Sequence, residues 1–85
     1  MKDVLQKQII DPLEEAVENE EVSIRVMHRI KGLLPSITDS ARQEVEEILE
    51  AFLDADECGE SERALEEMQK MLGYLEGYLL LMPDS

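Results

Sequence analysis

The 85-residue chain has no tryptophan, a single cysteine and a single histidine, and only three of its residues are Tyr or Phe. So few aromatic rings exclude a stacking platform of the kind that binds single-stranded nucleic acid. The lone cysteine, Cys58, cannot form a disulfide within the chain and fits a reducing compartment. One histidine and one cysteine also give little support for a metal site or a nucleophile–base pair, so we expect no metal and no cofactor.

Basic residues and long apolar runs are scarce as well. There are 8 basic residues against 21 acidic ones, and the formal net charge of −13 repels nucleic acid and anionic membranes. No apolar run approaches the roughly 18 residues of a membrane span. Residues 1–16 carry acids and glutamines where a secretory signal would have an apolar centre. We therefore expect a single cytoplasmic domain over residues 1–85, without nucleic-acid or membrane partners.

Helical periodicity is the dominant pattern in the sequence. Apolar residues recur every three to four positions in four segments, and polar or proline-containing breaks separate these segments. Short connections favour antiparallel neighbours, so the sequence predicts an all-α, antiparallel up-down four-helix bundle. The predicted core-facing residues are Leu5, Ile9, Leu13, Ala16 and Val17; Val22, Val26, Met27, Ile30 and Leu33; Ala41, Val45, Ile48, Leu49, Phe52 and Leu53; and Leu65, Met68, Leu72, Leu75, Leu79 and Met82.

Pro12 leaves the first segment open to two interpretations. Asp11, Pro12 and Glu14 have the pattern of an N-cap, a first-turn proline and a capping-box acid. Either a helix begins at Asp11 after a short leading helix, or one helix kinks at this point. The other predicted boundaries are Pro35, an N-cap at Thr38 or Ser40, the terminator Gly59, an N-cap at Ser61, and Pro83.

His28 lies in a stretch, residues 25–31, that has three of the eight basic residues and no acidic one. Successive helical residues are about 100° apart, so Val26 and Ile30 each lie about 160° away from His28 around the helix. The histidine should therefore point away from the core. The residues that share its face at helical spacing are Ile24, Arg25, Lys31 and Gly32, and Arg29 lies farther round.

The run His28-Arg29-Ile30-Lys31-Gly32 resembles the signature of histidine-containing phosphotransfer domains, in which a histidine is followed by any residue, an aliphatic residue, lysine and glycine. The resemblance implies that His28 accepts a phosphoryl group and exchanges it with an aspartate of a receiver domain. Lys31 would neutralise the phosphoryl oxygens, and Gly32 would leave room for the receiver. Arg25, Arg29 and Ile24 would support docking. Such a carrier has no self-contained catalytic site.

A non-enzymatic interaction module is the alternative. Its acids would meet a basic partner, either as an adaptor or as a mimic of the charge of DNA. The end of the chain, residues 78–82, is apolar on more than one face, which indicates a homodimer contact through the C-terminal helix as a further alternative. Gly73 and Gly77 have the spacing that permits close helix packing, either inside the bundle or between two copies.

Overall fold

The computed structural model describes the backbone of residues 2–81 and the side chains of residues 3–81. This part of the chain is helical throughout apart from short turns, so the predicted all-α class is confirmed. No helix within it is long and apolar enough to cross a membrane. The elements are α1 (Lys2–Leu5), the π-helical turn η1 (Gln6–Ile10), α2 (Asp11–Glu18), α3 (Ile24–Leu33), the 3-10 turn η2 (Leu34–Ser36), α4 (Asp39–Glu57) and α5 (Ser61–Leu81).

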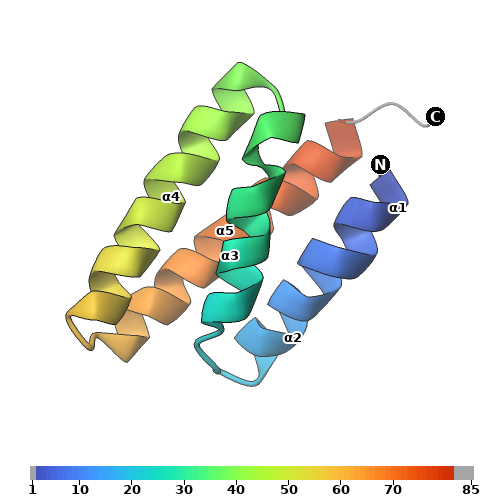
Figure 1. Cartoon of the computed structure of the whole chain (residues 1–85). Coiled ribbons are helices and arrows are strands. Elements are labelled where there is room, and N and C mark those ends of the chain that lie inside the picture. Colours follow the sequence, from blue (N-terminus) through green and yellow to red (C-terminus); the bar gives the residue numbers. More distant parts are fainter. Residues whose placement is uncertain (1, 82–85) are drawn as a thin grey trace.

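The first three elements form one continuous N-terminal helix, as Figure 1 shows. At the π-turn the N–H of Asp11 donates to the carbonyl of Gln6, and Asp11 has ordinary helical dihedral angles. The Asp11 side chain is no N-cap, because it accepts a hydrogen bond from Gln6 Nε2 at 2.7 Å. Of the two interpretations of Pro12, the structure rules out a new helix that begins at Asp11; the chain forms one helix, with a π-turn directly before Asp11. The wider turn carries both Ile9 and Ile10 into the core, although the simple helical period predicted only Ile9.

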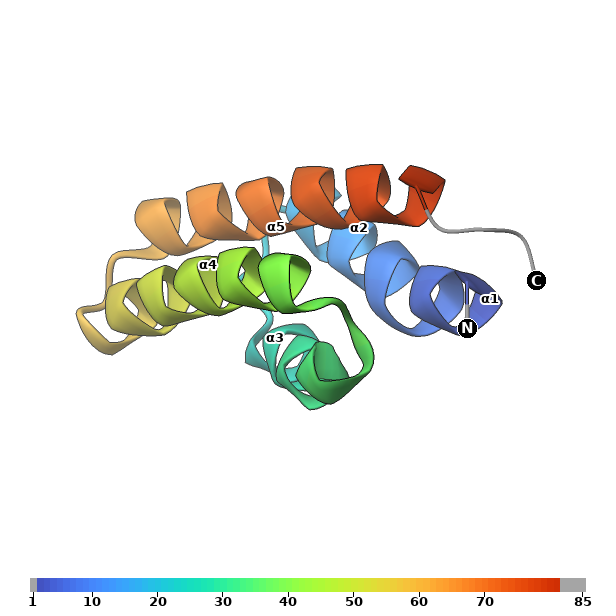
Figure 2. The same cartoon turned by 90° about the horizontal axis from the view of Figure 1, so that it is seen from above.

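The four helical segments pack around one apolar core. Helices α4 and α5 lie side by side over most of their length (Figure 1), and the N-terminal helix packs against α5. In Figure 2, α3 and α5 lie on opposite sides of the molecule, so α3 covers the side of the core opposite α5. Phe52 lies at the centre of this core with no exposed surface. The other largest fully buried side chains are Leu5, Ile10, Leu13, Met27, Ile30, Val45, Met68, Met71 and Leu75.

Two of the predicted helix boundaries are confirmed. Thr38 caps α4, since its Oγ1 accepts a hydrogen bond from the N–H of Ala41 at 3.3 Å. Gly59 follows α4 with φ of 74°, a conformation in which glycine carries no steric penalty. Ser61, predicted as a cap, is instead the first residue of α5, and the carbonyl of Glu60 accepts from Ala64.

Some of the predicted core positions are wrong. Leu53 is 37% exposed, whereas Ala55, two residues later and therefore about 160° away around the helix, is fully buried. Ala64 is likewise buried although the predicted stripe of α5 omitted it. At the end of α5, Leu80 and Leu81 are 82% and 86% exposed. The predictions for Met82 and Pro83 lie outside the described residues.

Candidate functional site

Helix α3 separates its apolar and basic residues onto opposite faces. Ser23 caps the helix, and its Oγ accepts a hydrogen bond from the N–H of Val26 at 3.4 Å. Val26, Met27 and Ile30 are buried in the core. The predicted site residues all lie on the exposed side; they are Ile24, Arg25, His28, Arg29, Lys31 and Gly32. The helical wheel thus placed His28 correctly, and its imidazole is accessible to a partner.

Among residues 3–81, the three cations of α3 lack acidic partners, and two of them, Arg25 and Lys31, also make no side-chain hydrogen bond. Within residues 3–81, no carboxylate forms an ion pair with Arg25, Arg29 or Lys31. Other cations of the chain do have acidic partners: Arg42 pairs with Asp39, Arg63 with Asp54 and Glu60, and Lys70 with Glu67. In a chain with 21 acidic residues, the cations around His28 thus differ from Arg42, Arg63 and Lys70 in having no ion pair within residues 3–81.

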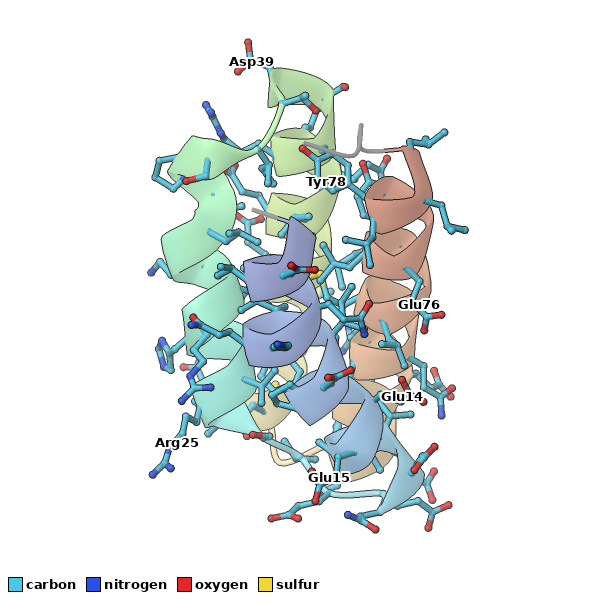
Figure 3. All side chains as sticks on the ribbon, turned by 90° about the vertical axis from the view of Figure 1, so that its right-hand side faces the viewer. Glu14, Glu15, Arg25, Asp39, Glu76 and Tyr78 are labelled. Carbon is cyan, nitrogen blue, oxygen red and sulfur yellow. The ribbon has the colours of Figure 1, made fainter. Side chains whose placement is uncertain are left out.

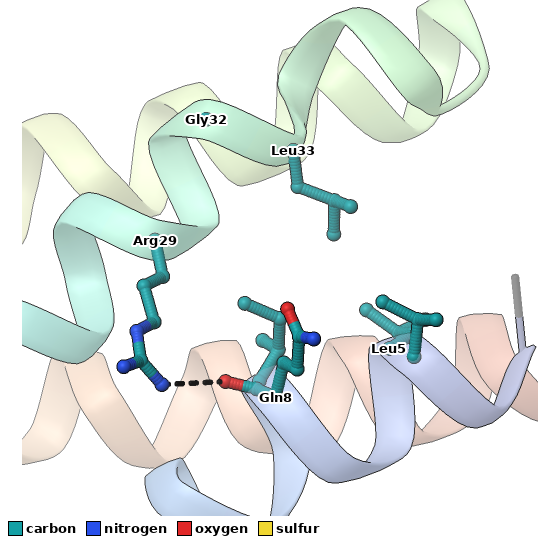
Figure 4. A pocket seen from close by; sticks show the side chains of 7 residues that line it. Leu5, Gln8, Arg29, Gly32 and Leu33 are labelled. Carbon is teal, nitrogen blue, oxygen red and sulfur yellow. Dashed lines mark hydrogen bonds between the residues drawn. The ribbon is translucent and has the colours of Figure 1, made fainter.

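Arg29 connects α3 to the N-terminal helix. Its Nη1 donates a hydrogen bond to the backbone oxygen of Gln8 at 3.5 Å, marked by the dashed line in Figure 4. In a regular α-helix that oxygen would accept from residue 12, but Pro12 has no N–H. Pro12 could have indicated in the sequence that the carbonyl of Gln8 needs another donor. The sequence interpretation did not make this inference. Arg29 therefore orients α3 on its neighbour rather than lying beside His28.

Gly32 borders an open hollow between α3 and the N-terminal helix. A Cβ atom at this position would meet nothing within 4 Å, so packing within the chain does not require glycine there. Because Gly32 has no side chain, the hollow stays open next to Arg29 (Figure 4). Gly32 itself lies one helical turn after His28. The hollow is lined by Val4, Leu5, Gln8, Ile9, Arg29, Gly32 and Leu33.

Lys31 borders a second hollow, between the end of α3 and α4. Two acidic residues of α4, Glu46 and Glu50, also line it. Arg42, which the sequence interpretation also missed, fixes the turn beside this hollow. Its Nε donates to the carbonyl of Leu34 at 2.9 Å, and its Nη2 donates to the carbonyl of Ile37 at 3.4 Å. The apolar lining consists of Leu34, Leu49 and Leu53.

The arrangement gives α3 an accessible imidazole, cations without an acidic partner within residues 3–81, and a hollow on either side. An unprotonated imidazole nitrogen is a nucleophile, and nearby cations stabilise negative charge on a group that reaches it. Within residues 3–81, no group of three His, Cys, Asp or Glu side chains is placed to hold a metal ion.

No protein-family model matches this chain, and neither the curated proteins nor the solved structures contain a significant match to it.

Proposed function

We propose that this chain is a phosphoryl carrier of the histidine phosphotransfer type, with His28 as the acceptor and an aspartate of a receiver domain as the donor. The observation that carries the proposal is the exposed imidazole of His28 among cations that have no carboxylate partner within residues 3–81. All of the glutamates lie between residues 14 and 76, and none of them forms an ion pair with Arg25, Arg29 or Lys31.

The transfer step follows from this arrangement. An unprotonated nitrogen of His28 attacks the phosphorus of the aspartyl phosphate. The P–N bond forms as the P–O bond breaks, and the aspartate leaves as a carboxylate with the electron pair. Negative charge on the transferring group is spread over its three equatorial oxygens, and positioned cations stabilise it. Lys31 and Arg25 lie on the same helical face as His28, within one turn on either side. The receiver supplies its own metal ion and most of the catalytic groups.

The up-down arrangement of the four helices belongs to the same proposal. The connections between successive helices are short, which favours antiparallel neighbours. In such a bundle, the helix that carries the histidine has one face in the core and one face free for a partner. Both the burial of Val26 and Ile30 and the exposure of His28 agree with this arrangement.

The hollows on the two sides of α3 support docking of a receiver. Gly32 leaves the first hollow open, and Ile24 offers a 41% exposed apolar side chain at the start of the helix. Arg25 has no acidic partner within residues 3–81 and would meet acidic groups of the receiver, whereas the guanidinium of Arg29 donates to the carbonyl of Gln8. The net charge of −13 would otherwise repel an acidic partner, so a local basic face is what such docking requires.

The test is transfer from phosphorylated receiver domains. A panel of receivers from the same organism is phosphorylated and mixed with this chain, and intact mass is measured. We expect one phosphoryl group on the wild-type chain, stable in base and labile in acid, and none on a His28→Gln variant. Lys31→Gln should slow transfer at least tenfold, because it removes a charge near the reacting oxygens.

Lys7→Gln is the matched control, because Lys7 is also exposed but lies on the N-terminal helix. It should leave the rate of transfer within twofold of the wild-type value. No adduct across the whole panel would exclude the carrier role, and so would an adduct that persists in His28→Gln. If Lys31→Gln and Lys7→Gln slow transfer equally, the rate depends on the net charge of the chain and not on the position of Lys31 in α3.

A further inference from the structure

A second surface lies where the last turns of α5 meet the N-terminal helix. Figure 3 shows Glu76 of α5 and Glu14 of α2 on one side of the molecule, and Arg25 of α3 on the other. This surface therefore shares no residue with the face that carries His28. It contains a groove lined by Gln6, Ile10, Glu14, Glu76, Leu79 and Leu80.

The groove adjoins the most exposed large apolar side chains of residues 3–81. Leu80 and Leu81 are 82% and 86% exposed, compared with 48% for Val4, the next in order. A single exposed leucine needs no explanation. Here Leu80 lines the groove together with Ile10 and Leu79, and Leu81 follows it in the chain, so exposed apolar surface gathers at one place, as it does where partners bind.

Two glycines extend this surface along α5. At about 100° per residue, Gly73 lies about 20° and Gly77 about 60° from Leu80 around the helix. A Cβ at either glycine would meet nothing within 4 Å, so neither is used for packing inside the bundle. Glycine inside a helix is less stable than alanine. Together with Leu80, the two positions offer a smooth strip against which another helix can lie closely.

The shape and charge of the groove define its occupant. Gln6, Ile10 and Glu14 recur at intervals of four residues, so the groove follows the N-terminal helix for about two turns. An amphipathic helix fits a channel of this kind. Both charged residues of the lining, Glu14 and Glu76, are acidic. We propose that this groove binds an amphipathic helix of a partner protein, whose apolar stripe is flanked by lysine or arginine.

A second copy of this chain fits the groove less well. A symmetric pair joined at this surface would bring Glu14 and Glu76 of one copy toward the same acids of the other. Each copy also carries a net charge of −13. Like charges brought together at an interface are unfavourable, so charge complementarity favours a basic partner over self-association.

Binding of a labelled model peptide tests the proposal. The probe is a helical peptide of about 18 residues with a leucine stripe flanked by lysines, and fluorescence anisotropy is the readout. We expect saturable binding that Leu80→Ser/Leu81→Ser weakens at least tenfold and Glu14→Gln/Glu76→Gln at least fivefold. Glu46→Gln/Glu50→Gln removes the same charge beside α3 and should change binding less than twofold. A peptide with glutamate in place of lysine should not bind.

The glycines provide a readout that a purely structural role would not give. Gly73→Ala/Gly77→Ala should raise the thermal midpoint and weaken peptide binding, because the methyl groups meet no atom of this chain but hinder the close approach of a helix. His28→Gln should bind the peptide as the wild type does, so the result is independent of phosphoryl transfer.

Three results would overturn the proposal. One is the absence of peptide binding. Another is equal weakening by the two pairs of Glu→Gln substitutions, which would show only general attraction to an acidic protein. The third is a dimer in sedimentation that Leu80→Ser/Leu81→Ser dissociates, which would make a second copy the occupant.

Discussion

The guanidinium of Arg29 on α3 donates a hydrogen bond to the backbone oxygen of Gln8, where Pro12 has removed the usual helical donor. Arg29→Gln should therefore lower the free energy of unfolding by about 0.5 kcal/mol, the low end for a hydrogen bond, since this one is long and exposed. Arg25→Gln is the control. Its guanidinium makes no hydrogen bond to the described residues, and its loss should change stability by less.

The proline is tested by a double-mutant cycle. Pro12→Ala restores an N–H that can bond to Gln8, so Arg29→Gln should cost less in the Pro12→Ala background than in the wild type. Urea unfolding gives the four free energies. If the cost of Arg29→Gln is the same in both backgrounds, the link between the missing N–H and the arginine is wrong.

Two glycines should respond in opposite directions to the same substitution. Gly32→Ala should raise the free energy of unfolding by about 0.5–1 kcal/mol, because alanine is the better helix former and its Cβ meets no other atom. Gly59→Ala should lower it by about 1 kcal/mol, since φ at this position is 74°. Thermal or urea unfolding measures both changes. A stability loss in Gly32→Ala would show that the space beside α3 is already filled.

Thr38 and Ser40 were equal candidates in the sequence for the cap of α4, and the structure assigns the cap to Thr38. Thr38→Ala should lower the free energy of unfolding by about 1 kcal/mol, because the N–H of Ala41 loses its acceptor. Ser40→Ala should be neutral or slightly stabilising, because Ser40 lies inside the helix and alanine favours helix there. Equal losses from both substitutions would contradict this assignment.

Alkaline pH should destabilise the fold through Tyr74. Burial, the nearby Glu44 and Tyr78 raise the pKa of Tyr74, so folding favours its protonated form. This contribution is fully present below the unfolded value of about 10 and is lost as the pH rises through the higher folded value. Tyr74→Phe should lose less stability than the wild type between about pH 9 and pH 11. These two pH values lie about one unit below and above the unfolded pKa of tyrosine. Urea unfolding at the two pH values checks this, with Tyr78→Phe for comparison.

The sequence predicted much of the fold because helical period and capping are local. Thr38 and Gly59 act through their own turns, and their roles were visible in the sequence. The outward direction of His28 followed from simple helix geometry, since Val26 and Ile30 had to be buried. These features do not depend on how the four helical segments are placed relative to one another.

The features that sequence reasoning missed depend on contacts between helices. The π-turn before Pro12 places both Ile9 and Ile10 in the core, and that choice is set by packing against α3 and α5. The acceptor of Arg29 lies 21 residues away in the chain. Leu53 is 37% exposed, although its position in the helical period of α4 predicted burial. A period along one helix contains no information about these contacts.

The most direct test of the central claim is to locate the phosphoryl group after transfer. Trypsin cleaves after Arg25 and Arg29, so a digest of this chain releases residues 26–29, the peptide that contains its only histidine. After reaction with a phosphorylated receiver, mass spectrometry at neutral to alkaline pH should find one phosphoryl group on this peptide, lost after brief treatment with acid. An adduct on any other peptide, or an unmodified chain with every receiver, would contradict the account of His28 as a phosphoryl carrier.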